Sequence, residues 1–177
     1  MPTFAAGQAE CHVFTFKEGA LSALAHDLEV QVGRFSIEVA PDLALDAKFD
    51  AGSLTVAHAV KDGRPSDALS DGDKRKIEKT ILGDVLDAKR FPEIRFVAPA
   101  PTRTPTGDGF VYQGQLTLHG KTRPIEVRSR AAGTTQVAEL MLHQPDYGIK
   151  PYSAMLGTLK IRPDIKVRIA VPWQPAG

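Results

Sequence analysis

Residues 110–129 read FVYQGQLTLHGKTRPIEVRS, and this stretch decides the fold. From Phe110 to Leu118, every second residue is apolar or glycine. His119-Gly120-Lys121-Thr122 then provides a turn, and the alternation resumes from Ile125 to Ser129. Alternation with a period of two predicts strands that bury one face. Two such strands joined by a short turn predict a hairpin within an antiparallel sheet.

The same alternation continues on both sides of this hairpin. Upstream it covers residues 28–39, where its phase slips by one position at Gly33-Arg34 and predicts a bulge or a bend. Downstream it covers residues 138–142, 159–161 and 165–171. We count about eight strands, the number at which a closed sheet can hold one small ligand. Such a sheet either packs on a second sheet or closes on itself, and the pattern alone leaves both open.

One segment, between residues 70 and 90, breaks the alternation. Ser70 or Asp71 is expected to cap a helix there, and Gly83 predicts that this helix ends near Leu82. The apolar residues of the segment fall on a helical stripe: Ile77, Ile81, Leu82, Val85 and Leu86. We therefore predict an all-β fold with a short helical insertion.

Composition and charge exclude several classes of protein. The chain has 22 basic and 21 acidic residues, so no overall field attracts nucleic acid or an anionic membrane, and only local charged patches remain. No apolar run approaches the length of a membrane-spanning helix. The single Cys11 excludes an intramolecular disulfide. Residues 1–14 lack the pattern of a secretory signal, so we expect a cytoplasmic protein, or a periplasmic one if a leader precedes this sequence.

Motifs for catalysis and metal binding are missing from the sequence. The five histidines show no spacing typical of metal ligands, and there is no nucleophile elbow or glycine-rich phosphate loop. We interpret His26-Asp27 as a junction before a strand and Cys11 as a structural thiol. The sequence therefore predicts no catalytic residue, no metal ligand and no cofactor.

The apolar faces of the strands are the remaining candidate site. The same residue types fill a core or line a cavity, and a filled core is the commoner arrangement. Nine of these residues are predicted to point into one interior: Phe14, Phe16, Phe35, Phe49, Phe96, Leu116, Leu118, Leu140 and Leu142.

Four motifs follow one another along the chain. They are Leu24-Ala25-His26-Asp27-Leu28 with Val32-Gly33-Arg34-Phe35, the helical segment closing with residues 82–96, the stretch 114–125, and Asp146-Tyr147-Gly148-Ile149. In this order they resemble the YceI family of polyisoprenoid-binding, lipocalin-like domains, over residues 9–173 as one domain. The resemblance implies an extended eight-stranded antiparallel barrel with a helical insertion at about residues 70–90. It also implies an apolar tunnel that binds or transports a long isoprenoid or acyl chain without catalysis.

The resemblance suggests where the polar head of such a lipid lies. We expect it near the loop ends, at His26, His119, Lys121, Arg123 and Tyr147. Many family members carry an arginine shortly before the Asp-aromatic-Gly element, where this chain has Gln144-Pro145.

Two other hypotheses stay open at this point. One is a histidine-based enzyme or metal site at the mouth of the barrel that uses His26, His119 or His143. The other is a barrel with a filled core that serves protein interaction. A homodimer, formed through a strand edge or through Val171-Pro172-Trp173, also stays open.

Overall fold

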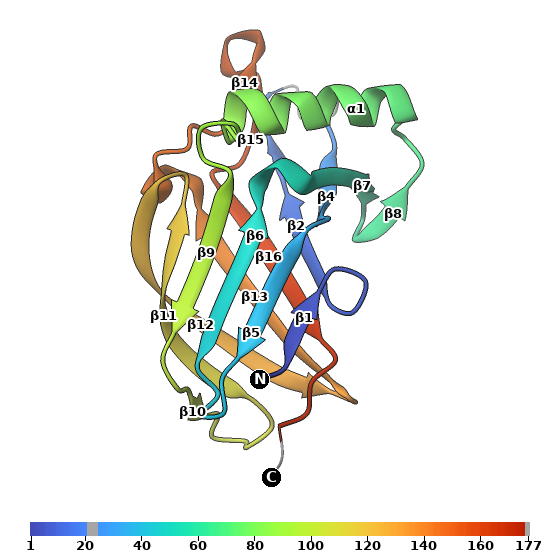
Figure 1. Cartoon of the computed structure of the whole chain (residues 1–177). Helices are drawn as coiled ribbons and strands as arrows, with labels where there is room; N and C mark the ends of the chain where they lie inside the picture. The colour runs from blue at the N-terminus through green and yellow to red at the C-terminus, as the bar shows by residue number, and fades with distance from the viewer. Residues whose placement is uncertain (21–24, 176–177) are drawn as a thin grey trace.

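The structure, a computed structural model, describes residues 1–20 and 25–175. Leu24, the first residue of one motif above, lies outside this part. The chain forms a strongly curled antiparallel sheet, which confirms the predicted all-β class (Figure 1). The long strands are β2 (Glu10–Thr15), β4 (Asp27–Val32), β5 (Phe35–Val39), β6 (Leu45–Asp50), β7 (Leu54–Lys61), β9 (Glu93–Ala98), β11 (Phe110–Leu118), β12 (Lys121–Ala132), β13 (Thr135–His143) and β16 (Asp164–Val171).

The remaining elements are short. Six short strands lie beside the long ones: β1 (Thr3–Ala5), β3 (Lys17–Glu18), β8 (Arg64–Ser66), β10 (Thr102–Arg103), β14 (Ser153–Ala154) and β15 (Leu159–Ile161). The helical elements are η2 (Ala51–Ser53), α1 (Asp71–Thr80), the π-helical turn η3 (Ile81–Val85), η4 (Gln144–Tyr147) and η5 (Met155–Gly157). All of the pairings between strands are antiparallel, as the alternating pattern predicted.

The sheet closes into a ring through one bent hairpin. Paired strands follow the order β5-β6-β9-β11-β12-β13-β16-β2-β4-β7. Because β5 continues from β4 and β7 continues from β6, the two ends of this order belong to the same hairpin. With each bent strand taken as one, the ring of the described residues has eight strands: β2, β4–β5, β6–β7, β9, β11, β12, β13 and β16. This barrel matches the lipocalin-like arrangement that the family resemblance implied.

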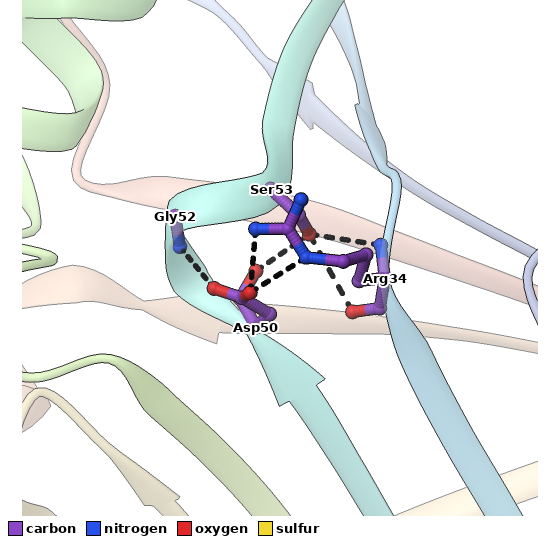
Figure 2. A network of polar contacts seen from close by, with 4 residues as sticks. All are labelled: Arg34, Asp50, Gly52 and Ser53. Carbon is purple, nitrogen blue, oxygen red and sulfur yellow. Dashed lines mark hydrogen bonds and ion pairs between the residues drawn. The ribbon is translucent and has the colours of Figure 1, made fainter.

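A network of polar contacts holds the hairpin at its bend (Figure 2). The Arg34 guanidinium donates to the Asp50 carboxylate at 2.7 and 2.9 Å, and this contact lowers the pKa of Asp50. The Ser53 hydroxyl accepts from the Arg34 amide at 2.9 Å and donates to the Asp50 carbonyl at 2.7 Å. At Gly33 a Cβ atom would lie 3.1 Å from the Ser53 carbonyl oxygen, so the two strands approach closely there. The bend predicted at Gly33-Arg34 is confirmed.

Helix α1 crosses one end of the barrel (Figure 1). Ser70 caps it, since its hydroxyl accepts from the Asp73 amide while the Asp73 carboxylate accepts from the Ser70 amide. The Glu78 carboxylate accepts from the Val56 amide at 2.8 Å and ties the helix to β7, next to a shift in the β4–β7 register. The α-helix ends at Thr80, earlier than predicted, because a wider π-helical turn continues from it.

No helix in residues 1–20 and 25–175 has both the length and the apolar character needed to cross a membrane.

Candidate functional site

The interior of the barrel holds an apolar cavity of about 580 Å³. Strands β2, β4, β5, β6, β9, β11, β12, β13 and β16 all contribute to its wall, and α1 and η3 close one side of one end. Every second residue of β13 from Gln136 to Leu142 lines the cavity, as does Gln144 directly after the strand, so the space follows β13 for most of its length. No aspartate or glutamate lines the cavity among the described residues.

Small side chains on the inner face explain why the interior is not filled. Strand β2 presents Cys11, Val13 and Thr15 to the cavity, while Ala47 on β6 and Ala138 on β13 leave room opposite. The prediction that Phe14 and Phe16 face the interior is therefore wrong, because the alternation of β2 runs in the other phase.

The aromatic residues of β2 have other surroundings. The Phe14 ring lies on the outer face, 4.6 Å from the Lys166 ammonium. Phe16 follows the end of β2, and its carbonyl accepts from the Arg162 amide at 2.7 Å. Neither ring belongs to the cavity wall.

Six of the other predicted residues do line the cavity: Phe49, Phe96, Leu116, Leu118, Leu140 and Leu142. Phe35 is buried without reaching the cavity, and its ring stacks on Phe49 with 5.6 Å between the centroids. Gly114 leaves the space that Phe96 occupies, since a Cβ at this position would lie 2.5 Å from the Phe96 ring. The glycine in the middle of the 110–129 stretch thus shapes the wall.

Aromatic residues close the cavity at the end away from α1. Trp173 lines this end and stacks on the buried Phe110 with 5.8 Å between the ring centroids. Tyr112 lies beside Phe110 and donates its hydroxyl to the Leu43 carbonyl at 3.2 Å. Burial raises the pKa of Tyr112 to about 12, so its hydroxyl stays protonated. These rings form a floor for the cavity.

The opposite end carries the exposed and basic part of the wall. Lys76 of α1, Lys160 of β15 and Tyr152 all line the cavity and are exposed to solvent, and His26 lines it beside them. The Lys160 ammonium lies 3.7 Å from the Glu18 carboxylate. Because the exposed lining residues gather here, we identify this end as the mouth.

Of the five predicted head-group residues, only His26 lies at the cavity. His119, Lys121, Arg123 and Tyr147 instead gather around the turn at η4. The His119 Nδ1 atom lies 3.2 Å from the Tyr147 carbonyl oxygen, and the Arg123 guanidinium donates to the Asp146 carbonyl at 2.9 Å. The Tyr147 side chain is buried, with 2% exposed. These residues hold η4 against the β11–β12 hairpin. Their role in the structure is therefore to pack the rim of the barrel, away from the cavity wall.

The histidines of the enzyme hypothesis do not come together. His143 pairs with Asp164 at 2.7 Å, and the His119 ring packs on Phe91. His12 and His58 flank Glu29 on the outer face of the barrel, where His12 Nδ1 lies 3.1 Å from the carboxylate. In the described part of the chain, no three histidine, cysteine, aspartate or glutamate side chains form a group suited to a metal ion.

Cys11 is the thiol of the cavity wall. It is 3% exposed, and burial raises its pKa to about 12. A thiol in this state stays protonated at neutral pH and is a poor nucleophile. The interpretation of Cys11 as a structural thiol agrees with this environment.

Comparison with known proteins identifies relatives of this chain. A family profile of the YceI-like domain matches residues 9–172. The chain belongs to the YceI-like family. A UPF0312 protein of Shewanella sp. (strain MR-4) is 30% identical over 131 residues, which cover 67% of this chain and 64% of the relative, less than two thirds of its length.

Two solved structures share the fold of this YceI-like chain. Burkholderia cenocepacia BcnA has a TM-score of 0.64 at 15% identity, covering 93% of this chain and 95% of its own. A polyisoprenoid binding domain from Saccharophagus degradans, implicated in plant cell wall breakdown, has a TM-score of 0.60 at 11% identity. That comparison covers 95% of each chain.

Several residues of the YceI-like cavity were not among the predicted site residues. Ile77, Ile81, Val85 and Leu86 reach the cavity from α1 and η3. Their helical stripe was visible in the sequence, but the pattern does not show which surface the stripe covers. Likewise, nothing in the sequence predicted that Trp173 lies at the floor of the cavity.

Proposed function

We propose that this protein binds one long apolar lipid chain inside the barrel and carries it without chemical change. The observation that supports this proposal is the cavity itself, with its largely apolar wall, aromatic floor and exposed mouth. The polyisoprenoid binding domain of Saccharophagus degradans has the same fold, which is consistent with such a ligand. The lack of a carboxylate in the described wall and the protonated Cys11 thiol favour binding over catalysis.

The length of the cavity indicates the length of the ligand. Eight residue steps separate Gln136 on β13 from Gln144, the residue directly after this strand, and both line the cavity. A rise of about 3.4 Å per residue and a strand tilt of about 40° give roughly 21 Å along the barrel axis. An extended alkyl chain advances about 1.3 Å per carbon, the projection of a C–C bond of about 1.5 Å. The space therefore fits a linear chain of roughly 16 carbons, or an isoprenoid chain of similar length.

Binding of this kind depends on buried area. Each buried methylene contributes about 0.8 kcal/mol, so ten of them contribute roughly 8 kcal/mol before the cost of ordering the chain. A preformed cavity lowers that cost because the protein does not reorganise. At the mouth, Lys76, Lys160 and His26 are the residues placed to contact a polar head.

The proposal is tested by what the purified protein holds and takes up. We expect native mass spectrometry and organic extraction to show a bound lipid, and the emptied protein to take up a fluorescent fatty acid. Leu118→Arg should abolish uptake, because Leu118 lines the cavity and an unpaired charge there is strongly unfavourable. Met141→Arg is the matched control, since Met141 is exposed on the outer face of β13. Uptake that is absent from the wild-type protein, or unchanged in a folded Leu118→Arg variant, would contradict the proposal.

A further inference from the structure

The hairpin formed by β14, η5 and β15 is the outermost part of the molecule at the mouth end, where it extends beyond α1 (Figure 1). Its tip carries Leu156, whose side chain is fully exposed to solvent, at 106% of the reference value. Leu156 also has a φ of 56°, in the left-handed region that a leucine seldom adopts. Tyr152, just before the hairpin, is 40% exposed. An exposed apolar side chain on a strained backbone points to a use outside the folded chain.

The hairpin that carries the exposed tip also forms part of the cavity wall. Tyr152, Leu159 and Ile161 line the cavity from the hairpin side, and Lys76 and Ile77 of α1 line the same mouth. One hairpin therefore carries the exposed Leu156 at its tip and lining residues of the mouth at its base.

The charges around the mouth favour an anionic surface. Exposed cations on α1 and beside the hairpin are Arg75, Lys76, Lys79, Lys150 and Lys160. Several acidic side chains on and beside these elements already accept hydrogen bonds or form ion pairs. Asp73 accepts from Ser70, Glu78 accepts from the Val56 amide, and Glu18 pairs with Lys160. Asp71 lies in the first turn of α1, and Asp84 is exposed on η3. Basic residues beside an apolar tip match the headgroups and acyl region of an anionic bilayer.

We propose that the β14–β15 hairpin inserts its tip into an anionic lipid bilayer, so that the cavity loads and unloads directly from the membrane. This inference rests on the proposed function and adds the surface from which the lipid comes. Leu156 and Tyr152 enter the bilayer, and the cations of α1 and the hairpin contact the headgroups. The lipid chain then passes between bilayer and cavity without crossing water.

The experiment compares Leu156→Ser with Met141→Ser in the full chain. Both variants remove an exposed apolar side chain, one at the tip and one on the barrel wall. Binding is measured by co-sedimentation with vesicles of phosphatidylcholine and phosphatidylglycerol, and transfer by movement of a fluorescent lipid between vesicles. We expect Leu156→Ser to bind vesicles roughly tenfold or more weakly and to transfer lipid more slowly, because one leucine side chain no longer enters the bilayer. Met141→Ser should behave as wild type, and Arg75→Gln with Lys79→Gln should weaken binding mainly at low salt.

The outcomes separate this inference from the proposed function. Uptake of a fluorescent fatty acid from solution, without vesicles, reports on the cavity alone and should be unchanged in Leu156→Ser. If the wild-type protein takes up the soluble probe but does not sediment with vesicles, the docking inference is overturned. The apolar tip is then expected to bind a protein partner instead. Equal vesicle binding by Leu156→Ser and Met141→Ser overturns it as well. Failure of the wild-type protein to take up the soluble probe contradicts the proposed function instead.

Discussion

Ala138→Trp should convert the cavity from one that fits a long chain into one that fits a shorter chain. Ala138 lines the cavity near its aromatic floor, six residue steps from Gln144, which follows β13 at the mouth end. Those steps leave roughly 16 Å of axial length, against roughly 21 Å in the wild-type protein. An indole at this position therefore leaves room for about 12 carbons in place of about 16.

The expected loss of affinity follows from the carbons that no longer fit. Four excluded methylenes at about 0.8 kcal/mol each amount to about 3 kcal/mol, or roughly a 200-fold weaker binding of a 16-carbon acid. A 12-carbon acid should bind nearly as it does to the wild-type protein. Displacement of a fluorescent fatty acid by a series of acids of increasing length measures both values.

Met141→Trp adds the same side chain on the outer face of the same strand and is the matched control. Thermal unfolding of both variants checks that the barrel is intact. Equal losses for the short and the long acid, or no loss for the long one, would refute the reasoning that the chain lies along β13 down to the floor.

Three further predictions concern single residues. Trp173 is the only tryptophan of the sequence and lines the floor of the cavity. Fatty acids of about 16 carbons should therefore change its fluorescence, whereas acids of eight carbons, which end short of it, should not. A fluorescence response that does not depend on chain length would contradict this placement. Cys11 has a pKa of about 12 in the folded state and of 9.0 when unfolded, so the free energy of unfolding should fall as the pH rises above 9.0. This fall should be smaller in Cys11→Val. Denaturant unfolding from pH 8 to 11 measures both proteins. Asp50 has a pKa below its usual 3.8, so its contribution to stability is present above pH 3.8 and is lost as the pH falls through the folded pKa. Asp50→Asn should lower the unfolding midpoint at pH 7, and a gap between the two proteins that does not narrow as the pH falls below 3.8 would argue against this role.

The sequence was a good guide to the strands and to the points where they change direction. Alternation over residues 110–129 identified a hairpin whose inner residues are buried on β11 and half-buried on β12, and the slip at Gly33-Arg34 marked the bend that closes the ring. These predictions succeed because a period of two and a glycine at a close approach are local requirements.

The inner face of β2 was harder to predict, for a physical reason. Residues 11–16 are apolar or weakly polar on both faces, so the bulky Phe14 and Phe16 were favoured over Cys11 and Val13. A cavity, however, needs small inward residues, and an outer phenylalanine can pack under a lysine, as Phe14 does under Lys166. The rule that the larger apolar residues of a strand point inward predicts the inner face well only where the core is filled.

The head-group residues illustrate a different limit. His119, Arg123 and Tyr147 stand in the most specific motifs of the chain. At the rim, His119 contacts the Tyr147 carbonyl and Arg123 donates to the Asp146 carbonyl. Their contacts hold a turn in place, whereas Lys76 and Lys160, which stand at the mouth, belong to segments without a distinctive motif. Which polar residues face the cavity depends on how α1 and β15 dock, and that is a property of the folded chain.

The pairing of β2 with β16 has a consequence for the order of events in the cell. Cys11 lies opposite Ile169 and His12 opposite Arg168, so the first long strand of the ring, which pairs with β4 on one side, finds its second partner only in the last strand. Contacts between such distant parts of a chain form late, because closing a long loop costs entropy before any contact repays it. A nascent chain that has not yet released residues 164–171 from the ribosome therefore has an open sheet with its inner face uncovered. Under the proposed function, lipid loading would follow the release of residues 164–171, and a chaperone that shields apolar strands would have its greatest effect before that point.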